Sequence, residues 1–540
     1  MPRAREYDRG VESPQSSSSL GNDGAMSGRD DGAYQRLGAV VDRASSVCTG
    51  TDRRLWWLVV VAVGAMIACW SIGAPYFSGP DEPLHASRAW SVVHGQIIGE
   101  ETNQGGFRLV EVPAWLDADR NDTSCYRLDT EKVADCFSLE PSSRIVTTRT
   151  QGAQFPLFYM IAGLPFRFSD GGLSLLLSRV WAGLLAAALI ASAVVTARNS
   201  DSRRWLLPAT LLACTPMVFY IAGVMNPSGI EIASGLLLWV ASLTIFCDRQ
   251  VNRRALWRFA VAASLLILIR QLGPLWVVVI VSSCVLLSTI GRLKELLGNR
   301  NFRLAALVVA ASVVLWALWS FSLKPLAISD SGEGVDGPAT EILRQQLGRL
   351  WVVLQESVGV FGWLEVRLPL TVYLIWIVGV LLFIALAVIF GPRKYALVPL
   401  FVLAAAILLQ TLGEFRTIKE LGFMWQGRYT LPILVGVPLV SALAISRANP
   451  SIAVSRLSKW IGGLLIWGAL CLSYFQTERR YMVGSLGPLD IWNRGIWNPP
   501  IPVLVLLVGF SVSAAMWILI CAAATKYVVT PLPGDGTPSK

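Results

Sequence analysis

Residues 55–75 read LWWLVVVAVGAMIACWSIGAP, an uncharged and largely apolar run that is long enough to cross a membrane as one helix. Similar runs recur along the chain. Of its 540 residues, 54% are hydrophobic and only 15% are charged, and the mean hydropathy is +0.54. A soluble domain carries roughly 25% charged residues. The composition therefore excludes a soluble enzyme and predicts an all-α polytopic membrane protein.

The apolar runs predict about twelve transmembrane helices, which together fill a membrane domain over residues 55–524. If the N-terminus is cytoplasmic, each inner loop has more basic than acidic residues, whereas the outer loops are mixed or acidic. This asymmetry predicts that both termini are cytoplasmic. It also accounts for the net charge of +10 without a nucleic-acid partner. The predicted spans are 55–75, 172–197, 204–223, 229–247, 256–272, 274–290, 304–322, 371–390, 395–412, 429–446, 460–475 and 501–524.

Polar segments complete the predicted organisation. A large first extracytoplasmic loop follows the first span, and a second large outer loop lies in the other half of the chain. The apolar segment 153–168 is short and contains Pro156 and Pro165. Counting it as a span would place the later basic loops outside, so we predict an interfacial helix there. The predicted segments are a disordered cytoplasmic tail (1–54), the two outer loops (76–152 and 323–370) and a C-terminal cytoplasmic tail (525–540).

Two of the nine cysteines share one polar loop, whereas most of the others lie in apolar runs, where single cysteines usually act as small hydrophobic residues. We predict a disulfide between Cys125 and Cys136, which requires their loop to face an oxidising compartment. The chain has no CxxC pair and no His/Cys cluster, so a structural zinc site is not expected.

The residues directly after the first span are the first candidate site. Positions 76–85 read YFSGPDEPLH, in which Pro80 and Pro83 flank Asp81 and Glu82. Proline restricts the backbone, so the two carboxylates are held where the span meets the loop. A carboxylate there can act as a general base or bind a divalent cation, with His85 as a further candidate ligand. The alternative is an ordinary solvated acidic loop.

Ionisable residues at the outer ends of several predicted spans form a second candidate group. These are Arg179, Glu231, Arg270 and Arg428. Charges within a membrane are costly and often mark functional sites. Their common side indicates a polar cavity that opens outward and is basic enough to hold a phosphate. For any one arginine, extension of the side chain towards the lipid headgroups is an equally good explanation.

Five motifs resemble the domain-of-unknown-function 2142 family of bacterial membrane proteins. The first is the most specific because it contains the PDEPxH pattern of that family. The resemblance covers residues 55–524. The motifs are GPDEPLHASRAWSVVHG (79–95), NPSGIEIASG (226–235), IRQLGPLW (269–276), FGWLEVRLP (361–369) and WQGRYTLP (425–432).

That family is similar to the GT-C glycosyltransferases, which are polytopic helical enzymes with a catalytic acidic residue in the first outer loop and a polyprenyl-phosphate sugar donor. The resemblance implies that Asp81 is the catalytic base and Glu82 its acidic neighbour. Arg270 and Arg428, with Arg179 assisting, are then expected to contact the donor phosphate. The chain departs from the pattern at Glu365, where aspartate is common, and at 154–158, which read QFPLF.

These observations together predict an inverting membrane glycosyltransferase at the outer face of a bacterial cytoplasmic membrane. Its partners would be a polyprenyl-phosphate sugar donor, a glycan, lipid or protein acceptor, and membrane lipids. A divalent cation, Mg²⁺ or Mn²⁺, bound by Asp81, Glu82 or His85 is left open. The main alternative is a transporter or flippase of lipid-linked sugars or another envelope precursor. A non-catalytic envelope scaffold is a second alternative.

Overall fold

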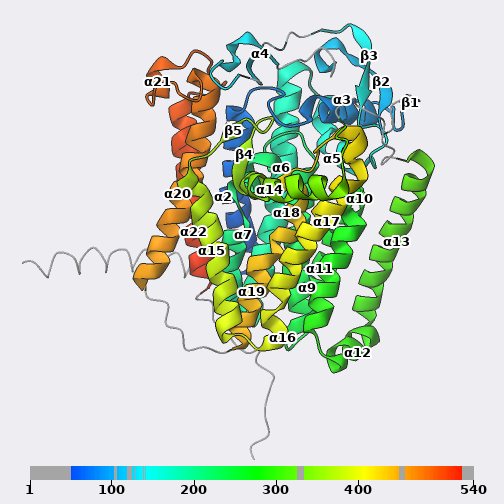
Figure 1. Ribbon diagram of the computed structural model, residues 1–540, viewed down its shortest axis with the longest axis vertical. Coiled ribbons are helices and arrows are strands. Elements are labelled where there is room, and N and C mark those ends of the chain that lie inside the picture. Colours follow the sequence, from blue (N-terminus) through cyan, green and yellow to red (C-terminus); the bar gives the residue numbers. More distant parts are fainter. Residues whose placement is uncertain are drawn as a thin grey trace, which may run out of the picture.

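Long helices run side by side through most of the molecule in the computed structural model (Figure 1). Nine helices or continuous helix pairs among the described residues are long and apolar enough to cross a membrane. The structure describes residues 50–102, 106–117, 124–127, 129–137, 139, 142–324, 334–448 and 456–525. Most of the predicted N-terminal tail (1–54) and C-terminal tail (525–540) lies outside these residues. The nine are α2 (Asp52–Gly73), α6 (Gly171–Arg198), α9 (Ser228–Cys247), α13 (Arg300–Leu323), α15 (Leu370–Phe390), α16–α17 (Arg393–Ala396 and Val398–Leu421), α18–α19 (Gly427–Leu434 and Gly436–Arg447), α20 (Arg456–Val483) and α22 (Val503–Ala524).

Two bent helix pairs raise the count of candidate spans to eleven. One pair is α7 (Arg203–Ala213) with α8 (Pro216–Ala222), bent by 61°, and the other is α11 (Gly273–Leu287) with α12 (Ile290–Gly298), bent by 120°. The remaining predicted span, 256–272, corresponds to α10 (Arg253–Ile269), which has only 17 residues. The all-α polytopic class is therefore confirmed. Nine to eleven candidate spans lie among the described residues, so the predicted count of twelve is not confirmed.

One end of the bundle carries most of the irregular structure. The elements α3, α4, α21 and the strands β1–β3 gather there, whereas α12 and α16 lie at the opposite end (Figure 1). The strands form an antiparallel sheet in the order β1-β2-β3, which the sequence analysis did not predict. The elements of the first loop are α3 (Glu82–Val93), β1 (Glu100–Glu101), β2 (Arg108–Pro113), η1 (Ala114–Leu116), α4 (Ser124–Arg127), η2 (Ala134–Cys136) and β3 (Ile145–Thr150).

The remaining short elements lie in the other irregular segments. The segment 153–168 forms two short helices, and neither is long enough to cross a membrane. The predicted disulfide between Cys125 and Cys136 is confirmed. The elements are α5 (Leu157–Ala162), η3 (Leu164–Arg167), α14 (Ala339–Gly359), β4 (Val360–Phe361), β5 (Val366–Arg367) and α21 (Ile491–Arg494).

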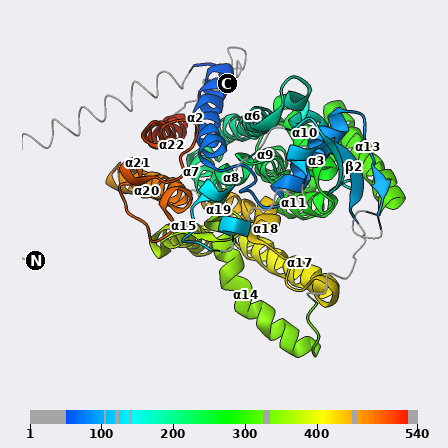
Figure 2. The ribbon, with the colours of Figure 1, turned by 90° about the horizontal axis from the view of Figure 1, so that it is seen from above.

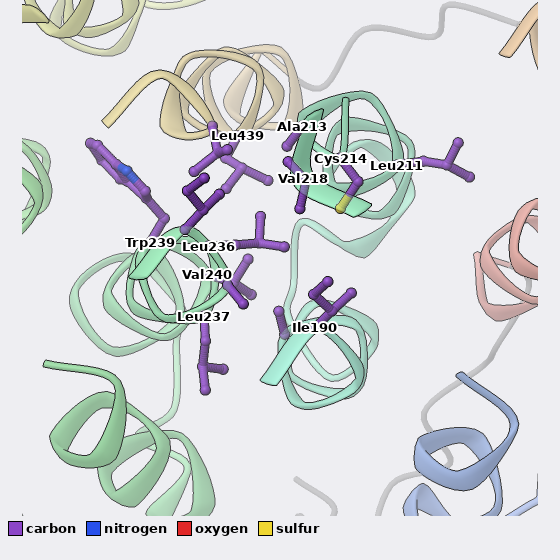
Figure 3. Close-up of a cluster of buried hydrophobic side chains, with 14 of the residues drawn as sticks. Ile190, Leu211, Ala213, Cys214, Val218, Leu236, Leu237, Trp239, Val240 and Leu439 are labelled. Atoms are coloured by element: carbon purple, nitrogen blue, oxygen red, sulfur yellow. The ribbon is translucent and has the colours of Figure 1, made fainter. Parts of the chain in front are cut away.

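Helix α9 lies at the centre of the bundle, among α6, α10, α11 and α18 (Figure 2). It is hydrophobic nearly all round, as a helix enclosed by other helices must be. Leu236, Leu237 and Val240 of α9 belong to a buried cluster that also includes Ile190 and Leu439 (Figure 3).

Glycines allow α18 and α19 to approach α9 closely. A Cβ atom on Gly436 would lie 2.1 Å from the Trp239 ring, and one on Gly235 would lie 2.9 Å from the Pro432 carbonyl oxygen. The Trp239 indole N–H donates to that same carbonyl at 3.1 Å. These contacts hold the second half of α18 and the start of α19 against the central helix.

Candidate functional site

The turn between α2 and α3 holds its residues in uncommon backbone conformations. Four described non-glycine residues have a positive φ. Three of them, Phe77 (60°), Asp81 (60°) and Leu364 (71°), meet at this turn, because the Trp363 indole N–H donates to the Phe77 carbonyl at 3.1 Å. Such conformations are costly, and they concentrate at sites that need a fixed geometry. They therefore support the prediction of a functional site at 76–85.

Glu82 and Arg179 form a buried ion pair behind this turn. Both side chains are fully buried, and the guanidinium binds both carboxylate oxygens, at 2.7 and 2.6 Å. The same carboxylate accepts the backbone N–H groups of Gly79 (3.2 Å) and Met225 (2.8 Å). The remaining donors of Arg179 bind carbonyl oxygens at the end of α2, those of Ser71, Ala74 and Pro75.

This network does not agree with the roles predicted for its two members. All five N–H groups of Arg179 are in hydrogen bonds within the protein, so the side chain has none to offer a donor phosphate. The Glu82 carboxylate points away from solvent and is held by the guanidinium. Both residues hold the turn in place, and this leaves Asp81 as the acidic residue that can face a substrate.

Asp81 differs from Glu82 in exposure and in its partner. About a third of its side chain (35%) is exposed, and Oδ2 accepts from Nη2 of Arg428 at 2.8 Å. Arg428 is itself buried, and its Nη2 also lies 3.2 Å from the hydroxyl of Tyr429. Its Nε has no hydrogen-bond partner among the described residues. The sequence placed these two residues far apart, and the fold brings them into contact.

Arg270 lies beside this pair and completes a basic site. It follows the end of α10, and its Nε is 3.4 Å from a carboxylate oxygen of Glu231. The other oxygen of Glu231 accepts the indole N–H of Trp276 at 3.1 Å. The Arg270 guanidinium lies over the ring of Tyr429, 5.6 Å from its centre, a cation–π distance. Glu231 therefore orients Arg270, and the same tyrosine ring contacts Arg428, 5.0 Å away.

His85 is buried behind the two arginines. Its Nδ1 and the hydroxyl of Tyr159 are hydrogen-bonded at 2.9 Å. Burial lowers the pKa of His85 well below its usual range, and the charges of Arg270 and Arg428 lower it further. The imidazole is therefore neutral at pH 7. Sequence analysis missed Tyr159 because it lies in the segment 153–168, where the only feature considered was membrane contact.

The residues named for a divalent cation do not gather around one point. The Glu82 oxygens are bound by Arg179, the Asp81 carboxylate by Arg428, and His85 by Tyr159. No group of three His, Cys, Asp or Glu side chains in the described part of the chain is placed to hold a metal ion. The residues present at this site therefore do not fit a shared cation.

Glu365 lies in the hairpin of β4 and β5, next to Leu364. Its Oε1 accepts from the hydroxyl of Tyr481 at 3.5 Å, and its Oε2 is buried without a hydrogen-bond partner among the described residues. Burial raises the pKa of Glu365 to about 7. The side chain is thus a titratable group beside the site rather than a contact of Asp81.

The fold and this site define a polytopic helical membrane protein in which a partly exposed carboxylate is paired with one arginine and lies near a second. Residues 65–437 match the family model described as "Predicted membrane protein (DUF2142)". The match covers more than half of the chain, and the protein belongs to this family, as the sequence motifs predicted. No curated protein matches the chain.

Two solved structures are similar to the chain, and both are of ArnT from Cupriavidus metallidurans. The crystal structure bound to undecaprenyl phosphate is 14% identical in sequence and has a TM-score of 0.42. The match covers 87% of this chain and 76% of the ArnT chain. The apo crystal structure is 13% identical, covers 87% and 75%, and has a TM-score of 0.41.

Replacing Arg179 with leucine is expected to destabilise the protein strongly. The substitution leaves the Glu82 carboxylate buried without its partner, which costs about 3–5 kcal/mol. Thermal unfolding of the detergent-solubilised protein should show a marked fall in melting temperature. Arg344→Leu, which removes an exposed arginine on α14, is the control and should change little. Equal effects of the two substitutions would contradict the structural role assigned to the ion pair.

The raised pKa of Glu365 predicts a pH-dependent stability. A carboxyl with a raised pKa in the folded state binds its proton more tightly there, so the stabilisation is complete below the ordinary pKa of glutamate, 4.5. It is lost as the pH rises through about 7. Glutamine cannot ionise, so the Glu365→Gln variant should not lose this stabilisation. Its melting temperature relative to that of the wild type should therefore rise between pH 5 and pH 8. A difference that stays constant with pH would refute this.

Proposed function

We propose that the protein is a membrane glycosyltransferase that moves a sugar from a polyprenyl-phosphate donor to an acceptor of the cell envelope. One observation carries the proposal: the partly exposed carboxylate of Asp81 lies beside the buried Arg428 and the partly buried Arg270, at the end of a membrane bundle. A carboxylate next to two guanidinium groups suits a reaction in which a hydroxyl loses a proton while a phosphate leaves.

In the proposed reaction, Asp81 accepts the proton of an acceptor hydroxyl as its oxygen attacks the anomeric carbon. The new carbon–oxygen bond forms as the bond between that carbon and the phosphate oxygen breaks. The electron pair of the broken bond leaves with the polyprenyl phosphate. A single displacement of this kind inverts the anomeric configuration. The proton and the charge both have an acceptor within the site, so the step balances without a further reactant.

The arginines would act on the leaving phosphate. Arg428 has an unpartnered, buried Nε group in addition to the Nη2 that binds Asp81. Arg270 is oriented by Glu231 and keeps an exposed fraction of 17% in its side chain. A guanidinium group can bind two phosphate oxygens at once through two parallel hydrogen bonds. Its fixed positive charge stabilises the negative charge that develops on the leaving group. Binding of the phosphate to Arg428 would free Asp81 to act as the base.

The geometry favours a transferase over a transporter. A secondary transporter holds its substrate near the middle of the membrane, often on broken helices. Here Asp81 directly precedes α3, which lies at the end of the bundle that carries the first-loop sheet (Figure 1), and Arg428 contacts Asp81. Transport of lipid-linked sugars or of another envelope precursor stays as the alternative, and the experiment on Asp81 separates the two.

We further propose that this end of the bundle faces outward from a bacterial cytoplasmic membrane. The disulfide Cys125–Cys136 supports this orientation because disulfides persist in oxidising compartments. The opposite end carries basic residues on α12 and α16, as expected for a cytoplasmic face with cytoplasmic termini.

Thiol labelling tests the orientation. Cys48, in the predicted N-terminal tail, is first replaced by serine so that it does not react. In this background the Cys125→Ser variant leaves the exposed Cys136 thiol free, and a membrane-impermeant maleimide added to intact spheroplasts should label it. The wild-type disulfide should resist labelling until it is reduced. Lys294→Cys on α12 is the matched control and should react only after permeabilisation. Labelling of Cys136 only after permeabilisation would contradict the proposed orientation.

Asp81→Asn tests the proposed reaction. Loss of a general base typically lowers the rate about 10²- to 10⁴-fold. A strain that lacks the protein would be complemented with wild type or variant at equal membrane levels, and its glycans and lipid-linked sugars measured by mass spectrometry. The variant should fail to restore a missing sugar while a polyprenyl-linked donor accumulates. Glu111→Gln, at an exposed carboxylate of the same loop, should restore it fully.

Full restoration by Asp81→Asn would exclude Asp81 as the base and favour the transport alternative. The stereochemistry of the product, determined by NMR, separately tests the inverting mechanism. A product that retains the configuration of the donor sugar would overturn the single displacement.

A further inference from the structure

The segment that precedes Arg428 has an irregular backbone inside a mostly helical protein. Helix α17 ends at Leu421, Gly422 turns the chain with φ 66°, and α18 begins only at Gly427. Backbone N–H groups in such a segment have no helical partners, and leaving them unpaired in a protein interior is costly. They must therefore find acceptors elsewhere, and two glutamates provide them.

Glu414 of α17 binds the first part of the segment. Its two carboxylate oxygens accept the backbone N–H groups of Met424 (3.2 Å) and Trp425 (2.7 Å). Its side chain is only 2% exposed and lies 3.5 Å from a guanidinium nitrogen of Arg349. A buried carboxylate needs such partners, because its desolvation is otherwise too costly. The contacts fix the position of the backbone as it leaves the turn.

Glu356 of α14 binds the last residue before the arginine. Its carboxylate accepts the backbone N–H of Gly427 at 2.7 Å, at the first residue of α18. The packing at this point leaves no room for a side chain, since a Cβ atom on Gly427 would lie 2.4 Å from the Val353 carbonyl oxygen. The hydroxyl of Ser357 adds a hydrogen bond of 3.2 Å to the Gly427 carbonyl. Helix α14 thus binds both the N–H and the carbonyl group of Gly427, the residue directly before Arg428.

We propose that Glu356 and Glu414 are positioning residues that hold Arg428 against Asp81 by binding the backbone amides of the segment 424–427. The inference rests on the proposed function, because it assigns Arg428 to the donor phosphate. Among the described residues neither glutamate forms an ion pair with Arg428, although Glu356 is near enough to interact with its charge. The hydrogen bonds of both glutamates are to the backbone amides of the segment. They supply hydrogen-bond acceptors from two different helices, α14 and α17. These acceptors fix the backbone before α18 and thereby the position of the Arg428 guanidinium.

The same segment also reaches the second arginine. The ring of Trp425 packs edge-on against Trp276, with the ring centres 6.5 Å apart, and Trp276 donates to Glu231. Glu231 in turn pairs with Arg270. Glu414 is therefore linked to both arginines, whereas Glu356 binds the residue directly before Arg428. Glu356 is the better residue for a test that isolates one pair.

The test measures binding of a polyprenyl phosphate to the full chain in lipid nanodiscs, with the phosphate-free polyprenol as the control ligand. Glu356→Gln replaces the carboxyl group that accepts the Gly427 N–H by an amide, and we expect affinity for the phosphate to fall about 10- to 100-fold. Affinity for the polyprenol should not change. Glu341→Gln, at an exposed carboxylate of the same helix, is the matched control and should bind like wild type.

A double-mutant cycle separates positioning from general damage. If Glu356 acts through Arg428, the variant with both Glu356→Gln and Arg428→Lys should bind no more weakly than Arg428→Lys alone. Losses that multiply would show that Glu356 acts independently of Arg428 and would overturn the inference. Glu414→Gln, taken through the same cycle, provides a second variant in case Glu356→Gln does not fold.

The outcomes also distinguish the inference from the function on which it rests. If the wild type binds the phosphate no better than the polyprenol, the proposed donor site fails and the inference falls with it. If Arg428→Lys weakens binding but both glutamate variants bind like wild type, the donor site stands and the positioning role is wrong.

Discussion

The buried ion pair of Glu82 and Arg179 is the interaction on which the geometry of the site depends. Helix α2 ends in the protein interior, and its last carbonyl groups have no helical donors. Arg179 donates to the Ser71 carbonyl in the last turn of α2 and to two carbonyls just beyond it, while Glu82 accepts backbone N–H groups from its own turn and from the loop before α9. Two charges that would be costly to bury alone thus satisfy the backbone of three segments. Asp81, the residue next to Glu82, is held in its left-handed conformation as a result.

A second set of buried carboxylates solves the same problem where α17 turns into α18. Irregular backbone within a membrane protein is tolerated only where protein groups satisfy it. Glu414 and Glu356 accept N–H groups there, as Glu82 does at the first turn. Each turn carries one member of the Asp81–Arg428 pair. The site is therefore built from two irregular segments, both fixed by carboxylates that are not themselves exposed to a substrate.

Much of the site could be recognised from sequence, but the roles within it could not. The pattern PDEP drew attention to Asp81 and Glu82 together, because adjacent carboxylates between prolines look alike in a sequence. The structure separates them: one is partly exposed and the other is fully buried against Arg179. Arg179 was grouped with Arg270 and Arg428 because all three lie at the same end of their helices. Only the count of its hydrogen bonds shows that it has no donor left for a ligand. Glu356, Glu414 and Tyr159 carried no local pattern that would have singled them out.

The sequence by itself determined the class of the protein, most of its membrane helices, its family and the disulfide, because these follow from local composition and from short motifs. Uncharged runs of sufficient length must be helical in a membrane, whatever surrounds them. The tertiary structure decided which charges pair with one another. Asp81 meets Arg428 across most of the length of the chain, and Glu82 meets Arg179 from another helix. The partner of a buried charge depends on helix packing over long sequence distances, and a pattern of neighbouring residues does not contain that information.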